Sequence, residues 1–175
     1  MPVPGPNSGL IIEVPDAESA VRRHREYLDA SASLGVPAHI TILAPFLPPG
    51  MIGSGDLSRL AELFAGIRRF RFVLDRTAWF GDEVLWLGPA DPRPFRELTR
   101  HVFGAYPACP PFEGQFEDVV PHLTIGHRHP VEVLLSAENA VQPYLPIAAS
   151  ASAVTLVTQQ SAGGIWTKSA VFALG

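Results

Sequence analysis

The sequence predicts an α+β fold built from two similar lobes, related by a pseudo-two-fold axis, whose antiparallel-rich sheets line a central cleft. Three observations predict this bilobal, duplicated fold. Residues 38–42 (AHITI) and 121–125 (PHLTI) repeat a short pattern nearly half a chain apart. Around both copies, apolar runs of strand length and amphipathic segments of helix length follow one another in the same order. The chain has 175 residues, 47% apolar and 17% charged, which is enough to bury a compact core.

The first half is predicted to run strand, helix, strand, helix, strand. Strands are expected where short apolar runs or apolar–polar alternation occur, and helices where apolar residues recur every three or four positions. The expected elements are a strand at 10–14, a helix from 16 to about 30, a strand at 39–46, a helix at 56–65 and a strand at 70–80.

The second half repeats this order and adds one final strand. Gly81-Asp82 favours a tight turn between the halves, and the Ser/Gly-rich residues 161–164 favour a hairpin. The expected elements are a strand at 83–87, helices at 91–103 and 131–141, a strand at 122–127, and closing strands at 151–159 and 165–174.

We therefore expect a single bilobal domain over residues 1–175, with lobe one at about 9–81 and lobe two at about 82–175. No run reaches the roughly 20 apolar residues that a bilayer-spanning helix needs, so no membrane partner is expected. Residues 1–6 lack a basic-then-apolar signal pattern, which predicts a cytoplasmic location. The oligomeric state is not predicted.

The charge and the cysteine content narrow the classes of partner. Binding to a long duplex requires many Lys and Arg side chains that neutralise phosphates, and this chain has 13 of them with a net charge of −4. The expected partner is a small nucleotide or an RNA end, and no long nucleic-acid duplex. Cys109 is the only cysteine, which excludes an intrachain disulfide and a thiolate metal cluster.

The repeated His-x-Thr pattern carries the chemistry. His39 and Thr41 lie two positions apart, as do His122 and Thr124, so each pair points to one face of its strand. Histidine can act as a general base or a general acid near neutral pH, and a threonine hydroxyl can donate to a phosphate oxygen. The pattern predicts that both histidines converge on one phosphorus atom, each with its threonine. Which histidine is the acid stays open.

A single His-x-Thr strand also occurs by chance. The two copies could be paired core strands or a degenerate binding site. A second copy with similar flanks and similar surrounding elements favours one shared functional site instead.

These residues resemble the motifs of the two-histidine (2H) phosphoesterase superfamily, the LigT-like proteins, which include 2′-5′ RNA ligase-like proteins and cyclic phosphodiesterases. Both family motifs, of the form His-hydrophobic-Thr/Ser-hydrophobic, are intact here, and the similarity covers nearly the whole chain. Pro45-Phe46 after the first motif and residues 116–121 before the second are similar to a bacterial branch of 2′-5′ RNA ligase family proteins.

The resemblance implies a bilobal α+β fold with a central cleft and neither a metal nor a nucleotide cofactor. It implies a hydrolase of RNA processing, a cyclic nucleotide phosphodiesterase that opens 2′,3′-cyclic phosphates or cleaves 2′-5′ phosphodiester bonds. The related reaction joins RNA ends reversibly through a 2′-5′ bond. By motif position, His39 and His122 become the acid/base pair, and Thr41 and Thr124 the phosphate-binding residues.

One departure from the family pattern bears on ligation. Many ligase-like relatives place an arginine five positions beyond the second histidine, whereas this chain has His127 there, followed by Arg128. Arg128 would point to the opposite face of a regular strand. The departure favours phosphodiesterase over ligase activity, with His127 and Arg128 as candidate substrate contacts.

Further candidate contacts are the aromatic residues Trp79, Phe80 and Trp166, on strands expected to flank the cleft. An aromatic ring there could stack on a base, although packing in the core is the common role of strand aromatics. Lys168 could likewise contact a phosphate.

Two rival functions remain at this point. His122, His127 and His129 could form the site of a metal-dependent hydrolase, but their spacing is loose and no carboxylate pattern accompanies them. Alternatively, the same cleft could belong to a non-catalytic module that binds nucleotides or RNA ends.

Overall fold

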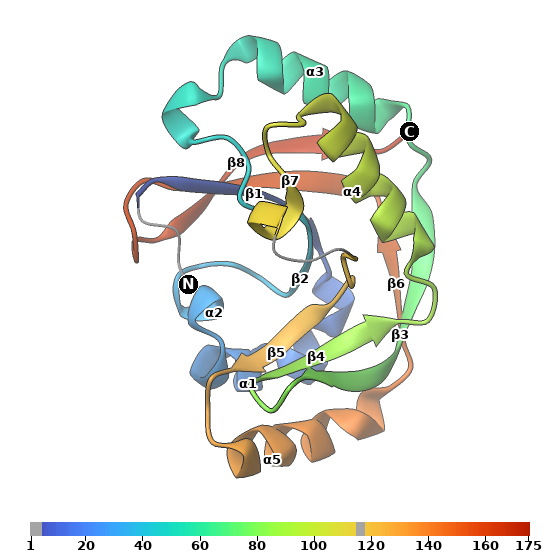
Figure 1. Cartoon of the computed structure of the whole chain (residues 1–175). Helices are drawn as coiled ribbons and strands as arrows, with labels where there is room; N and C mark the ends of the chain where they lie inside the picture. The colour runs from blue at the N-terminus through green and yellow to red at the C-terminus, as the bar shows by residue number, and fades with distance from the viewer. Residues whose placement is uncertain (1–4, 115–117) are drawn as a thin grey trace.

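Two antiparallel sheets with helices on their outer faces form the molecule in the computed structural model, which describes residues 5–114 and 118–175. In Figure 1, α3 and α4 lie at the top beside one sheet, and α5 lies at the bottom beside the other. The strands are β1 (Asn7–Glu13), β2 (His39–Leu43), β3 (Phe70–Phe80), β4 (Val84–Pro89), β5 (Leu123–His127), β6 (Ile147–Ala151), β7 (Ala153–Gln159) and β8 (Trp166–Ala173). The helices are α1 (Glu18–Leu28), α2 (Ala30–Ser33), α3 (Ser54–Ala65), α4 (Arg93–Ala105) and α5 (Val131–Val141).

The two His-x-Thr strands lie at the edges of different sheets. The first sheet has the strand order β2-β1-β7-β8, and the second has the order β5-β4-β3-β6. β2 and β5 are thus edge strands, and they lie close to each other in space. The α+β class and the two similar antiparallel sheets predicted from the sequence are confirmed.

The division between the sheets does not follow the expected lobe boundary at residues 81/82. β3, from the expected first lobe, forms a hairpin with β4 and so belongs to the second sheet. The boundary falls inside this hairpin, at Gly81, whose φ of 57° suits a glycine in a tight turn. β7 pairs with β1, so the C-terminal strands complete the first sheet.

Each half of the chain supplies the helix that covers the other half's motif strand. The segments β1-α1-β2 and β4-α4-β5 correspond, but α1 packs against β5 and α4 packs against β2. The Thr99 hydroxyl of α4 donates to the Ile42 carbonyl of β2 at 2.7 Å. Through this crossed packing, each edge strand is covered by a helix from the other half of the chain.

Gly126 permits the close approach of α1 to β5. A Cβ at this position would lie 2.6 Å from Leu134 Cδ2 and 3.0 Å from Leu28 Cβ. These two leucines belong to α5 and α1, so any larger residue would push both helices away from the strand. The glycine after the second motif is therefore a packing requirement of the fold.

Most predicted elements agree with the structure, with one strand missed. β3 and α5 occupy the predicted ranges 70–80 and 131–141. β6 was not predicted, because its sequence IAASA is rich in small residues with weak strand preference. Among the described residues, none of the helices is both long and apolar enough to cross a membrane.

Candidate active site

The first motif presents its polar side chains on one face of β2. His39 and Thr41 are partly exposed, whereas Ile40 and Ile42 are at most 1% exposed and join the core. This alternation confirms the predicted orientation of the strand. The first histidine and its threonine thus face away from the helix-covered side of the sheet.

The second motif has the same alternation. His122 directly precedes β5 and Thr124 lies on it, and both are partly exposed. Leu123 and Ile125 are fully buried in the same core as the isoleucines of β2. The two motifs therefore present equivalent side chains from two adjacent edge strands.

The two imidazole rings have the same hydrogen-bonded setting. His39 Nδ1 lies 2.8 Å from the Pro37 carbonyl oxygen, and His122 Nδ1 lies 2.7 Å from the Val120 carbonyl oxygen. Each acceptor is two residues before its histidine. Because a carbonyl oxygen can only accept, Nδ1 carries the hydrogen in both rings, and Nε2 is left to take up or release a proton.

Burial makes both histidines weaker bases than usual. It lowers the pKa of His39 to about 4, against the opposing effect of the hydrogen bond to Pro37. It also lowers the pKa of His122, again opposed by the hydrogen bond to a backbone carbonyl. The charge of His122 further lowers the pKa of His39, which places the two rings within electrostatic reach of each other. Both rings are neutral at pH 7 in the free protein.

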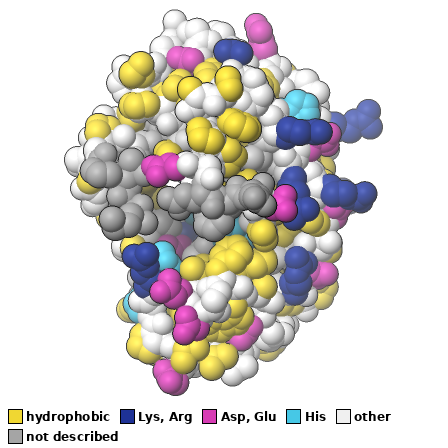
Figure 2. Space-filling view, in the orientation of Figure 1, with side chains coloured by type: hydrophobic (Ala, Val, Ile, Leu, Met, Phe, Trp, Pro, Cys, Tyr) yellow, Lys and Arg dark blue, Asp and Glu magenta, His cyan; other side chains and the backbone are white. Residues whose placement is uncertain are grey.

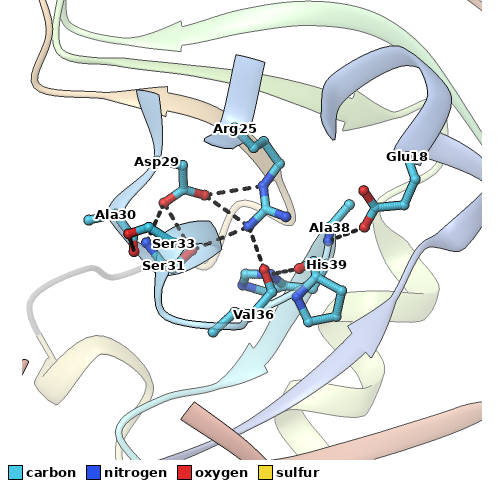
Figure 3. Close-up of polar contacts among 10 residues, drawn as sticks. Glu18, Arg25, Asp29, Ala30, Ser31, Ser33, Val36, Ala38 and His39 are labelled. Carbon is cyan, nitrogen blue, oxygen red and sulfur yellow. Dashed lines mark hydrogen bonds and ion pairs between the residues drawn. The ribbon is translucent and has the colours of Figure 1, made fainter. Parts of the chain in front are cut away.

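A buried ion pair lies beside His39 (Figure 3). Arg25 and Asp29 are 2% and 8% exposed, and Arg25 Nε and Nη2 donate to the same carboxylate oxygen at 3.2 and 3.0 Å. Their charges act on the pKa of His39 in opposite directions, since Arg25 lowers it and Asp29 raises it. Neither residue was predicted as a site residue, although opposite charges at i,i+4 spacing at the end of an amphipathic helix are a usable signal.

Aromatic rings surround His122 instead. Its ring centroid lies 4.9 Å from that of Phe80, 5.9 Å from that of Trp86 and 6.4 Å from that of Phe112. Phe80 was predicted as a substrate contact and lies at the site, whereas Trp86 was missed. Trp86 pairs in register with Thr124, and its Nε1 is the buried side-chain polar atom without a hydrogen-bond partner among the described residues.

Trp79 does not face the site, contrary to the prediction. Its indole N–H donates to Glu138 Oε1 of α5 at 3.1 Å, and the Thr77 hydroxyl donates to the same oxygen at 2.7 Å. Adjacent residues of a strand point to opposite faces, so the strand that turns Phe80 toward His122 turns Trp79 toward α5.

A bulge in β5 decides where His127 points. Leu85 pairs with Gly126 and Trp86 with Thr124, so Ile125 has no partner and is the extra residue of a bulge. His127 pairs with Val84, two positions from Trp86, and therefore shares a face with Thr124. Burial lowers the pKa of His127, and Asp29 raises it, so His127 lies within reach of the ion pair beside His39.

Arg128 lies beyond the end of β5 and is exposed. Its backbone N–H still donates to the Glu83 carbonyl at 2.8 Å, but its φ of 57° is not that of a strand residue. The expected placement on the opposite strand face is thus replaced by a turn. Its role as a substrate contact stays a prediction.

Trp166 and Lys168 lie on the motif face of the first sheet. Trp166 packs against Ile11 and Val157, and Ile11 is the register partner of Thr41. The Lys168 ammonium donates to Glu13 Oε2 at 2.7 Å, and Glu13 is the register partner of His39. A substrate phosphate would have to compete with this carboxylate for Lys168.

The alternative of a three-histidine metal site finds no support in the geometry. Within residues 5–114 and 118–175, no group of three or more His, Cys, Asp or Glu side chains is arranged to hold a metal ion. Cys109 is buried, and burial raises the pKa of its thiol. Residues 116 and 117, part of the resemblance described above, lie outside the described residues.

Comparison with known proteins identifies a family model that matches most of the chain and solved structures with a similar fold. A family model described as the 2′-5′ RNA ligase superfamily matches residues 13–163. No curated protein sequence matches. The crystal structure of Escherichia coli LigT complexed with 3′-AMP is similar over 98% of this chain and 99% of LigT, with a TM-score of 0.61 and 19% identity. The crystal structure of TT0787 of Thermus thermophilus is similar over 96% and 97% of the two chains, with a TM-score of 0.62 and 17% identity.

Proposed function

Because this chain belongs to the 2′-5′ RNA ligase superfamily, we propose that it is a phosphoesterase with His39 and His122 as its acid/base pair. Its substrate is a 2′,3′-cyclic phosphate or a 2′-5′ phosphodiester on a nucleotide or an RNA end. The observation that carries the proposal is the equivalence of the two rings. Each ring lies at the start of an edge strand or directly before it, donates Nδ1–H to the carbonyl two residues earlier, and keeps Nε2 for proton transfer.

The reaction needs one proton removed and one supplied. For a cyclic phosphate, one neutral histidine takes a proton from water through Nε2 as the water oxygen bonds to phosphorus. The bond from phosphorus to the 3′ oxygen breaks, and the other histidine, protonated, donates its Nε2 proton to that oxygen. The product is a 2′-phosphate with a free 3′-hydroxyl, and the histidines have exchanged protonation states.

The remaining site residues stabilise charge in this scheme. Thr41 and Thr124 donate hydroxyl hydrogens to the non-bridging phosphate oxygens, where negative charge accumulates in the transition state. Both histidines are neutral in the free protein, so the acid must gain its proton when substrate binds. A bound phosphate anion raises the pKa of a neighbouring imidazole, so the histidine that acts as the acid can be protonated in the complex.

The surface charge supports a small substrate. On the face shown in Figure 2, most Lys and Arg side chains of the described residues gather toward the right-hand side, with Asp and Glu side chains among them. With a net charge of −4, the chain lacks the excess of cations that a long phosphate backbone needs. E. coli LigT, which shares the fold, has been crystallised with 3′-AMP and with ATP. We therefore assign a nucleotide or an RNA end as substrate.

The test is a substrate panel assayed in the presence of a chelator. Nucleoside 2′,3′-cyclic phosphates, 2′-5′ dinucleotides and 3′-5′ dinucleotides are each incubated with the wild type, His39→Gln and His122→Gln. General acid–base catalysis contributes about 10²- to 10⁴-fold, so each variant should lose activity on that scale. His101→Gln is the matched control, because His101 is exposed on α4 and also donates Nδ1–H to a carbonyl.

Each contrary result points to a defined alternative. Full activity in both histidine variants would remove the acid/base pair. Tight binding by calorimetry without turnover across the panel would indicate a binding module. Activity lost in chelator and restored by zinc would indicate a metal-dependent hydrolase, and joined 2′-5′ products from RNA ends would indicate a ligase.

A further inference from the structure

Side chains of α1 hold the turn that precedes His39 (Figure 3). Arg25 Nη2 donates to the Val36 carbonyl at 3.2 Å, three residues before the histidine. The next carbonyl, that of Pro37, accepts the hydrogen bond from His39. Glu18 Oε1 accepts the backbone N–H of Ala38 at 2.8 Å. The peptide group that orients the ring is thus fixed on both sides by one helix.

The segment that precedes His122 repeats the arginine contact, although Pro121, which has no N–H, replaces Ala38. Arg96 Nε donates to the Val119 carbonyl at 3.1 Å, again three residues before the histidine. The next carbonyl, that of Val120, accepts the hydrogen bond from His122. Arg96 belongs to α4, which corresponds to α1 in the duplicated fold. At both motifs, therefore, an arginine donates to the carbonyl three residues before the histidine, and the histidine donates to the carbonyl two residues before itself.

Resting on the proposed function, we infer that Arg25 and Arg96 are positioning residues for His39 and His122. Among the described residues, the hydrogen bonds of both arginines go to partners other than the rings. Each fixes the carbonyl three residues before its histidine, which limits rotation of the following peptide and so fixes the carbonyl that accepts Nδ1–H. A backbone acceptor held in place keeps the proton on Nδ1 and aims Nε2 at the shared phosphorus.

The two arginines differ in what else they do. Arg25 is buried and also binds Asp29, so its planar guanidinium spans a carboxylate and a carbonyl, which the single ammonium of a lysine cannot reproduce. Removing its charge would leave Asp29 unpaired in the interior. Arg96 is exposed, so its replacement leaves the fold intact and gives the cleaner test.

The first experiment replaces Arg96 by methionine. Misplacement of a reacting group costs rate rather than binding, so we expect kcat to fall roughly tenfold with KM within about twofold and the melting temperature unchanged. Arg100→Met is the matched control, because Arg100 is an exposed arginine of the same helix whose ion pair is with Glu97. Equal losses in the two variants would overturn the inference.

The second experiment replaces Arg25 by lysine, with Arg23→Lys on the same helix as control. Lysine keeps a positive charge near Asp29 but loses the fork geometry. We expect a fall in kcat of roughly tenfold or more with little change in KM, and no change in the control. Unchanged kcat in a folded Arg25→Lys protein would overturn the inference for His39.

Imidazole ¹⁵N NMR tests the same inference without any assay of turnover. In the wild type, both rings should be single Nδ1–H tautomers when neutral. Arg96→Met should disturb the tautomer of His122 alone, and Arg25→Lys that of His39 alone. If no substrate in the panel is turned over, this readout still decides whether the arginines orient the rings; unchanged tautomers in both variants would overturn their role.

Discussion

His39 and His122 share one backbone setting but have different neighbours. Both donate Nδ1–H to the carbonyl two residues earlier, and an arginine binds the carbonyl before that one. The first ring lies beside a buried ion pair, and the second lies among the rings of Phe80, Trp86 and Phe112. The two copies thus have the same ring orientation and different electrostatic environments.

The different electrostatic environments of the two rings explain how two equivalent histidines can take different roles. Orientation is a property of the backbone, and the duplicated turns supply it twice. Proton affinity is a property of the surroundings, and burial next to Arg25 lowers the pKa of His39 to about 4. A ring that stays neutral over so wide a pH range suits the general base. We therefore expect His39 to act as the base and His122 as the acid in the opening reaction.

The largest effect should come from a substrate that needs no acid. With a nucleoside 4-nitrophenyl phosphodiester, the leaving nitrophenolate departs unprotonated, so an acid catalyst becomes superfluous. The deficit of His122→Gln, about 10²- to 10⁴-fold on a cyclic phosphate, should shrink to less than about tenfold. The deficit of His39→Gln should persist. A rescue of His39→Gln instead, measured as kcat/KM on both substrates, would exchange the two roles.

A smaller effect is expected at the threonines, and it should be symmetric. Thr41→Val and Thr124→Val keep the side-chain shape but remove the hydroxyl donor, and each should lower kcat by up to about 10²-fold. Serine at either position should restore most of the activity, since it keeps the hydroxyl. Full activity in one valine variant would show that the threonine of only one motif binds the phosphate. The two motifs would then differ in the role of their threonines as well as in the surroundings of their histidines.

The smallest effect is on stability as a function of pH. The folded-state pKa of His39 is about 4, below the ordinary value of 6.5, so the unfolded chain binds more protons between these values. Stability therefore rises with pH in that window, and is lost as the pH falls. From pH 7 to pH 5 the wild type should lose roughly 2 kcal/mol through this group.

Urea denaturation at the two pH values measures this loss. His39→Gln should flatten the dependence, and His122→Gln should flatten it as well, since burial lowers that pKa too. An unchanged slope in His39→Gln would mean that its ring is not held neutral by the fold.

Much of the fold and the core of the candidate site could be predicted from local pattern. Alternation in HITI and HLTI placed each histidine and threonine on one face and the isoleucines and leucine in the core, as observed. The helix predicted at about 131–141 is observed as α5. These features depend on side-chain periodicity, which can be read directly from the sequence.

Features that depend on tertiary pairing could not be predicted. The side of β3 on which Trp79 lies is set by its packing against Glu138 of α5, far away in sequence. The orientation of His127 depends on the unpaired Ile125, and a bulge has no signature in this segment. Arg25 is a polar residue of a helix, and only the fold shows that its side chain reaches the Val36 carbonyl, three residues before the first motif histidine.

The crossed packing of α1 and α4 affects how the molecule unfolds. Neither half could keep its own edge strand covered if the other half melted, because each strand's helix belongs to the opposite half. Unfolding should therefore be a single cooperative event. A chain nicked at the Gly81 turn should stay together as a non-covalent complex, since the separated pieces would each expose an interlocked apolar surface.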